Sequence, residues 1–203
     1  MVHIALFHSV LGLRPVERSA AERLRIAGHE VATPDLYQGR TASTLDQGFA
    51  LMNEVGWPVI TQRARRALEG LPADAVLAGI SMGAGVVGTL LADRPQAAAV
   101  LLLHALADIP ATARPGLPIH AHVADPDDFA PRADIAAWLD AADRTGVDAR
   151  VFTYPHAGHF YTDASLPDYD ERASGVTWRR ILDLLRLLPG GRSTTASLAL
   201  PKR

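Results

Sequence analysis

The segment Gly79-Ile80-Ser81-Met82-Gly83 decides the fold, because it lies between two apolar stretches of different character. Residues 75–78 form a short run typical of a buried strand, and residues 84–92 continue as a helix-like apolar stretch. A Gly-x-Ser-x-Gly pattern at a strand-to-helix turn strains the serine backbone and exposes its hydroxyl, and the glycines leave room for the neighbouring elements. The pattern predicts a nucleophilic Ser81, with the Met82 N–H at the helix start directed at an oxyanion.

The composition restricts the class of protein. A chain of 203 residues is long enough for one α/β domain, and 48% hydrophobic with 21% charged residues is typical of a globular protein. The net charge of −2 and the lack of a long basic run argue against a nucleic-acid partner. Without cysteine there is no disulfide and no thiolate metal site. No signal peptide or membrane-length apolar run is visible. We therefore expect a cytoplasmic enzyme, monomer or homodimer, that acts on a small molecule away from membranes and without a cofactor.

Strand and helix patterns alternate along the chain. Short apolar runs predict strands, and they occur at residues 2–7, 30–33, 75–80, 98–103, 118–123 and 149–154. Amphipathic or apolar segments predict helices, and they occur at residues 15–27, 46–71 (interrupted at Gly56-Trp57-Pro58), 82–93, 131–145 and 171–188. This alternation predicts a mostly parallel sheet with helices on both faces. Residues 1–188 would form a single domain, followed by a flexible tail at 189–203.

A serine nucleophile needs a general base, and a histidine is the usual choice. His159 follows the last predicted strand, and Gly158 before it lets the loop bring the imidazole back over the sheet edge. His156 in the same loop is the second candidate. Three further histidines lie at the end of one strand or along another, where buried core roles are the simpler interpretation: His104, His120 and His122.

The base in turn needs an acidic partner, which in proteins with this turn comes between the serine and the histidine in the chain. The loop after the fifth predicted strand supplies three carboxylates, Asp125, Asp127 and Asp128. We select Asp127, but elementary chemistry does not choose among the three. A cluster of acidic residues in a loop is also typical of a solvated turn.

The loop after the first predicted strand would complete the site. Its Val10 N–H is the expected second oxyanion donor, and Gly12 would let the loop pass close to the substrate. Aromatic side chains in the loops and helices near the carboxyl ends of the strands are candidates for the pocket wall: Tyr37, Trp57, Phe129, Phe160 and Tyr161.

Several segments together resemble the dienelactone hydrolase family of α/β hydrolases. They include Pro34-Asp35-Leu36-Tyr37, the Ala-Asp-Pro-Asp run at 124–127, and Tyr154-Pro155-His156-Ala157-Gly158-His159-Phe160, and the resemblance extends from Val2 to about Leu188. It implies a compact α/β-hydrolase domain with sheet order 2-1-3-4-5-6. It also implies that Asp127 is the acid and His159 the base.

The sequence departs from the family pattern at positions that bear on chemistry. Ser81 stands where the founding enzymes carry cysteine, which removes the thiolate route and makes a general base more necessary. Ser9 stands where those enzymes have a glutamate. The founding enzymes hold the substrate carboxylate with two arginines. Arg40 lies one position away from the place of the first, and Asp163 occupies the place of the second. Because an acidic residue repels a carboxylate, we expect a substrate other than dienelactone.

The motifs favour a serine hydrolase that cleaves a small ester, lactone or thioester through Ser81, His159 and Asp127. The alternative is a binding protein that keeps the fold without the chemistry, and the residues at positions 9 and 163 motivate it. A nucleotide-binding role is weaker, because the glycine-rich turn has no lysine and matches neither dinucleotide nor P-loop spacing.

Overall fold

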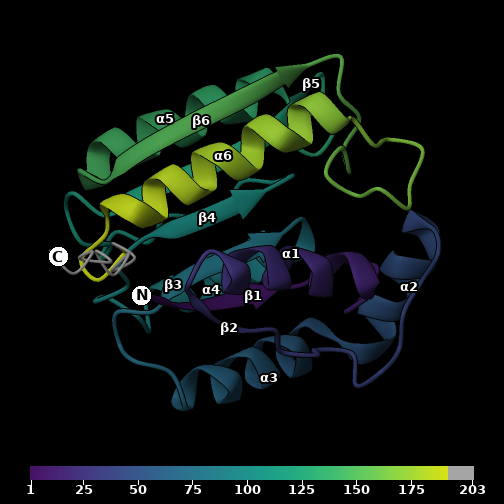
Figure 1. Ribbon diagram of the computed structural model, residues 1–203, viewed down its shortest axis with the longest axis horizontal. Coiled ribbons are helices and arrows are strands. Elements are labelled where there is room, and N and C mark those ends of the chain that lie inside the picture. The colour runs from purple at the N-terminus through teal and green to yellow at the C-terminus, as the bar shows by residue number, and fades with distance from the viewer. Residues whose placement is uncertain (192–203) are drawn as a thin grey trace, which may run out of the picture.

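The computed structural model describes residues 1–191, which are built around one six-stranded sheet (Figure 1). All five strand pairs are parallel, and the order is β2-β1-β3-β4-β5-β6, as predicted. The strands are β1 (His3–Phe7), β2 (Glu30–Ala32), β3 (Val76–Ile80), β4 (Val100–Leu103), β5 (Pro118–Asp125) and β6 (Asp148–Pro155). Because parallel strands end on the same edge, the loops after β1, β3, β5 and β6 meet there.

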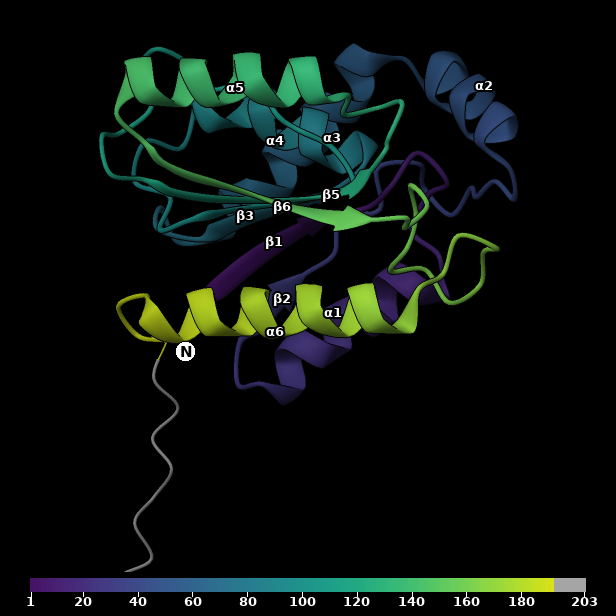
Figure 2. The same cartoon turned by 90° about the horizontal axis from the view of Figure 1, so that it is seen from above.

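Helices cover both faces of the sheet (Figure 2). The helices are α1 (Pro15–Ile26), α2 (Leu45–Val55), α3 (Trp57–Glu69), α4 (Met82–Leu91), α5 (Arg132–Thr145) and α6 (Glu171–Leu187). Helices α1 and α6 lie on one face, and α2 to α5 lie on the other. Every helix predicted from the sequence is present, with ends that differ by a few residues.

The predicted interruption at Gly56-Trp57-Pro58 separates α2 from α3. Gly56 has φ +83°, a left-handed conformation that glycine adopts without steric cost, and Pro58 is well placed at the start of the next helix. The turn brings the Trp57 ring against the first turns of α4, where a Cβ on Gly85 would lie 3.3 Å from the indole. The break therefore shapes the cleft described below.

Two apolar layers hold the helices to the sheet, and successive residues of β3 face them alternately. Leu77 packs with the layer under α3, α4 and α5, whereas Val76 and Ala78 pack with the layer under α1 and α6. Helix α4 is apolar around most of its circumference because it packs between the sheet and α3. This burial fixes the position of the turn that carries Ser81.

In the described part of the chain, no helix combines the length and the hydropathy that a membrane span requires. The predicted tail at 189–203 lies for the most part outside the described residues.

Candidate active site

Ser81 occupies the strained turn that the sequence predicts. Its backbone has φ 51° and ψ −110°, an unfavourable conformation for a residue with a side chain. A Cβ on Gly79 would lie 2.2 Å from the Gly83 carbonyl oxygen, and one on Gly83 would lie 2.4 Å from the Phe7 carbonyl oxygen. Only glycine fits at either position, so the two glycines allow the serine to stand out from the sheet edge.

Three side chains that are far apart in the sequence meet at this edge. The Ser81 Oγ lies 3.2 Å from His159 Nε2. On the other side of the imidazole, Nδ1 lies 2.9 Å from Oδ2 and 3.1 Å from Oδ1 of Asp127. The side chains of His159 and Asp127 are 10% and 1% exposed, so water competes little for their contact. The arrangement suits transfer of the serine proton to Nε2, with the carboxylate fixing the tautomer.

The other acidic and basic candidates point elsewhere. Asp125 forms two hydrogen bonds with Arg132, both 3.0 Å, and these lower the pKa of the carboxyl. Asp128 is exposed, and so is His156, whose backbone N–H donates to the Asp125 carbonyl. The structure therefore brings only Asp127 of the three carboxylates to His159.

Contacts on both sides of His159 hold its loop. The Phe160 N–H donates to Asp168 Oδ2 at 3.1 Å, and Gly158 packs against the same aspartate so closely that a Cβ there would lie 2.7 Å from its Cγ. Further along, Thr162 Oγ1 and His104 Nε2 are 2.7 Å apart. These bonds leave the imidazole few alternative positions.

Buried histidines surround the sheet edge without reaching Ser81. His8 donates from Nδ1 to the Ser9 carbonyl at 2.7 Å, while its Nε2 accepts from the Leu36 N–H at 3.0 Å, a pattern that requires the neutral ring. Burial lowers the pKa of His8 and, together with the nearby His159 and His122, lowers that of His104 well below its ordinary value. Within residues 1–191, no three metal-binding side chains are arranged to hold an ion.

His122 leads to a prediction on acid stability. Burial lowers the pKa of His122 from 6.5 to about 3, so below pH 6.5 the unfolded chain binds a proton that the folded chain excludes. The contribution of neutral His122 to the free energy of unfolding is fully present above pH 6.5 and is lost as the pH falls toward 3. Between pH 8 and pH 5 this residue should reduce the free energy of unfolding by about 2 kcal/mol. In urea titrations, His122→Gln should flatten the pH dependence by that amount. The same replacement at the exposed His156 is the control, and equal slopes for both variants and the parent chain would contradict the prediction.

A cleft of about 270 Å³ lies beside Ser81, on the sheet face covered by α2 to α4. Four residues predicted for the site line it: Val10, Trp57, Met82 and Phe129. The Met82 N–H belongs to the first residue of α4, where no carbonyl of the same helix can accept it. Val10 is on the loop after β1. The cleft thus adjoins Ser81 and both expected oxyanion donors.

Five further residues that we considered for the site do not line this cleft. Ser9 is buried and donates its hydroxyl to Glu17 at 2.7 Å. Tyr37 is also buried, with its hydroxyl against the Met82 sulfur at 3.1 Å, and burial raises its pKa to about 12. Arg40 pairs with Glu54 at the surface. Phe160 is 3% exposed and packs behind His159. Tyr161 is likewise interior, where its hydroxyl and that of Thr177 are 2.9 Å apart.

Five residues of the cleft escaped the sequence analysis: Phe49, Met52, Gly85, Ala105 and Leu106. Phe49 was the residue that could have indicated the cleft, because it is an aromatic residue on a helix of mixed polarity. Its side chain is 36% exposed in the structure. Apolar residues at helical spacing are usually core residues, so the pattern alone did not mark a cleft wall.

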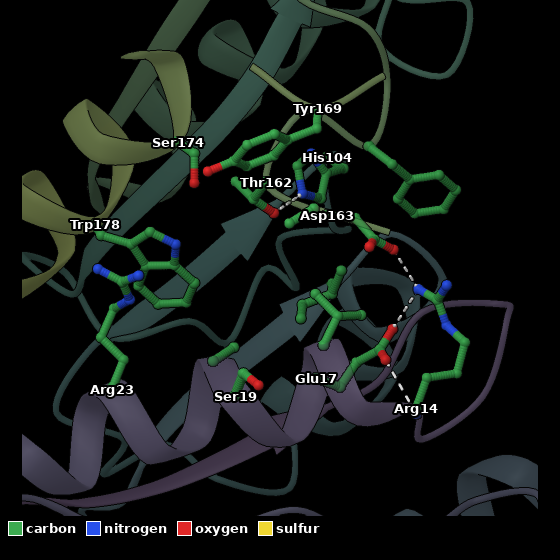
Figure 3. A pocket seen from close by; sticks show the side chains of 15 residues that line it. Arg14, Glu17, Ser19, Arg23, His104, Thr162, Asp163, Tyr169, Ser174 and Trp178 are labelled. Carbon is green, nitrogen blue, oxygen red and sulfur yellow. Dashed lines mark hydrogen bonds and ion pairs between the residues drawn. The ribbon is translucent and has the colours of Figure 1, made fainter. Parts of the chain in front are cut away.

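A second cavity of about 150 Å³ lies on the opposite face, between α1 and α6 (Figure 3). Arg14 spans its edge, where Nη2 donates to Glu17 Oε1 at 3.1 Å and to Asp163 Oδ2 at 2.6 Å. The side chains of Glu17 and Asp163 are only 2% and 5% exposed. Our expectation that Asp163 faces a substrate carboxylate was wrong in its placement: the aspartate pairs with Arg14 and lines this second cavity, not the cleft beside Ser81.

The strained serine turn, the parallel sheet and the histidine loop define an α/β hydrolase. A profile of the dienelactone hydrolase family matches residues 2–188. The chain therefore belongs to the dienelactone hydrolase family, which places it among enzymes that act on ester bonds. The resemblance inferred from the sequence motifs is confirmed.

Solved structures share this fold at low sequence identity. A dienelactone hydrolase-like promiscuous phosphotriesterase from metagenomic libraries is 17% identical with a TM-score of 0.75, over 93% of this chain and 87% of that one. Esterase PE8 is 16% identical with a TM-score of 0.63, over 91% and 93%. A phospholipase/carboxylesterase from Dyadobacter fermentans is 15% identical with a TM-score of 0.56, over 89% and 90%. No curated protein matches the chain.

Proposed function

We propose that the chain is a serine hydrolase that cleaves small esters, lactones or thioesters through an acyl-enzyme intermediate. The observation that carries the proposal is the continuous series of contacts from Ser81 Oγ through His159 to Asp127, at 3.2 Å and 2.9 Å. His159 takes the serine proton while Oγ attacks the substrate carbonyl carbon, and Asp127 stabilises the imidazolium.

The tetrahedral intermediate places a negative charge on the former carbonyl oxygen. The N–H groups of Met82 and Val10 bind this oxyanion, each contributing about 3–4 kcal/mol to transition-state stabilisation. His159 then protonates the leaving group, which departs as an alcohol or thiol, or stays attached as the free end of an opened lactone. Water, deprotonated by His159, attacks the acyl carbon and releases the acid together with the regenerated serine.

A fluorophosphonate probe tests the nucleophile directly. We expect the parent chain to be labelled on the peptide that contains Ser81, and Ser81→Ala to remain unlabelled while keeping its circular dichroism spectrum and melting temperature. A matched control is Ser165→Ala, because Ser165 also belongs to a loop at this edge but its hydroxyl donates to Asp163 at 2.6 Å. A folded parent chain without label on Ser81 would contradict the proposal and favour a binding protein that has kept only the fold.

A further inference from the structure

Among residues 1–191, no charged side chain lines the cleft beside Ser81. Apart from the serine hydroxyl and the indole N–H of Trp57, the side chains that form it are apolar or absent, and they belong to Val10, Phe49, Met52, Met82, Gly85, Ala105, Leu106 and Phe129. A substrate carboxylate that entered it would lose water without meeting a cation. The cleft therefore disfavours anionic acyl groups.

The arginines on the loops after β1 and β2 do not change this balance. Arg40 donates to Glu54 at 2.9 Å, and that hydrogen bond lowers the pKa of the glutamate. Arg14 is engaged with Asp163 and Glu17 on the other face of the sheet. Each guanidinium already has a carboxylate partner in the described structure, so neither is available to hold the carboxylate of a substrate.

The mouth of the cleft is aromatic. The rings of Phe49 and Phe129 are stacked with centroids 6.1 Å apart, and Phe129 also contacts the His159 ring at 4.5 Å. Phe49, Trp57 and Phe129 remain 36–45% exposed, which is unusual for three large apolar side chains grouped beside one nucleophile. An apolar substrate group would cover this surface and exclude water from it.

The size of the cleft limits that group. A cavity of roughly 150 Å³ accommodates benzene, so about 270 Å³ has room for one aromatic ring with a short linker, or for an alkyl chain of a few carbons. Trp57 bounds the space at Gly85, where a Cβ would lie 3.3 Å from the indole and crowd it.

We infer that this enzyme acts on uncharged esters that carry an aryl or short alkyl group, and discriminates against esters with a carboxylate on that group. The inference rests on the proposed function, since it requires Ser81 as nucleophile. It also has a consequence for turnover: the acid released by hydrolysis is ionised at neutral pH, and a cleft without a cation favours its departure.

A matched pair of activated esters tests the substrate class. p-Nitrophenyl pentanoate and mono-p-nitrophenyl glutarate have acyl chains of similar length, but only the second ends in a carboxylate. We expect kcat/KM at pH 7.5 to be about a hundredfold higher for the neutral ester, because burial of an unpaired carboxylate is costly. Rates with Ser81→Ala provide the background for both esters.

A charge introduced into the cleft wall should reverse part of this preference. Met52 lines the cleft on α2 and is flexible, so Met52→Arg would place a guanidinium, on a longer side chain, at the wall of the cleft. We expect this variant to reduce the preference for the neutral ester at least about tenfold. Met52→Gln, polar but uncharged, is the matched control and should keep most of the preference.

The outcomes separate the two proposals. Equal or faster cleavage of the glutarate ester by the parent chain would overturn the substrate class while the serine hydrolase stands. So would fluorophosphonate labelling of Ser81 without cleavage of either ester. Equal effects of the Met52→Arg and Met52→Gln substitutions would show that charge does not set the preference. Activity that persists in Ser81→Ala would instead overturn the proposed function.

Discussion

Asp127→Asn is expected to lower kcat about ten-thousandfold with little change in KM, because it fixes the wrong tautomer of the catalytic base. Asp127 Oδ1 accepts the Phe129 N–H at 2.9 Å, and the amide oxygen of the new side chain would keep that bond. The NH₂ group of the asparagine would then take the position of Asp127 Oδ2, which lies 2.9 Å from His159 Nδ1. With Nδ1 forced to accept, Nε2 carries the proton and cannot take one from Ser81.

The matched control for this prediction is Asp125→Asn in the same loop. The Asp125 carboxylate is paired with the exposed Arg132, so its loss should change kcat only a few-fold. Steady-state rates on a p-nitrophenyl ester, together with melting temperatures of both variants, make the comparison. Similar losses for the two variants, with both chains folded, would show that Asp127 is not the acid that orients His159.

The α/β class was predictable because its signals are local, whereas the strand order came from the family resemblance. Apolar runs of strand length alternate with helical periodicity, and parallel crossovers are restricted to one hand, so few topologies remain. The break between α2 and α3 was also predictable, since Pro58 lacks the N–H of a continuous helix and clashes with the preceding turn, and Gly56 lowers helix stability. The ends of the helices were less predictable because helix ends fray, so the terminal residue depends on local geometry more than on the apolar pattern.

Only those residues of the candidate site that lie in sequence motifs could be predicted from the sequence. Ser81 and His159 each lie in a distinctive segment, whereas the choice among three aspartates needed the family resemblance, and only coordinates show which carboxylate faces the imidazole. The misplaced residues have side-chain partners that their own segments do not identify: Ser9 binds Glu17 and Arg40 pairs with Glu54. Asp163 pairs with Arg14 across 149 positions, and no pattern around either residue announces that contact.

The largest effect on stability is expected for Arg14→Met. The substitution keeps much of the side-chain length but leaves the carboxylates of Glu17 and Asp163, now 3.1 Å and 2.6 Å from the guanidinium, buried without a cation. Removing one partner of a buried ion pair costs about 3–5 kcal/mol. For a chain of this size, the loss corresponds to a decrease of about 10 °C in melting temperature. Urea titration and calorimetry measure both quantities.

Two comparisons separate loss of charge compensation from loss of packing. Arg65→Met breaks an ion pair with Asp93 whose side chains are about half exposed, and should cost no more than about 1 kcal/mol. Adding Asp163→Asn to Arg14→Met removes one of the stranded charges, so the double variant should be more stable than Arg14→Met alone. With Asp163→Asn measured alone as well, the cycle is complete and its coupling free energy reports the interaction of the buried pair. If Arg14→Met costs no more than Arg65→Met, or if Asp163→Asn destabilises it further, the buried charges are not what holds α1 to the histidine loop.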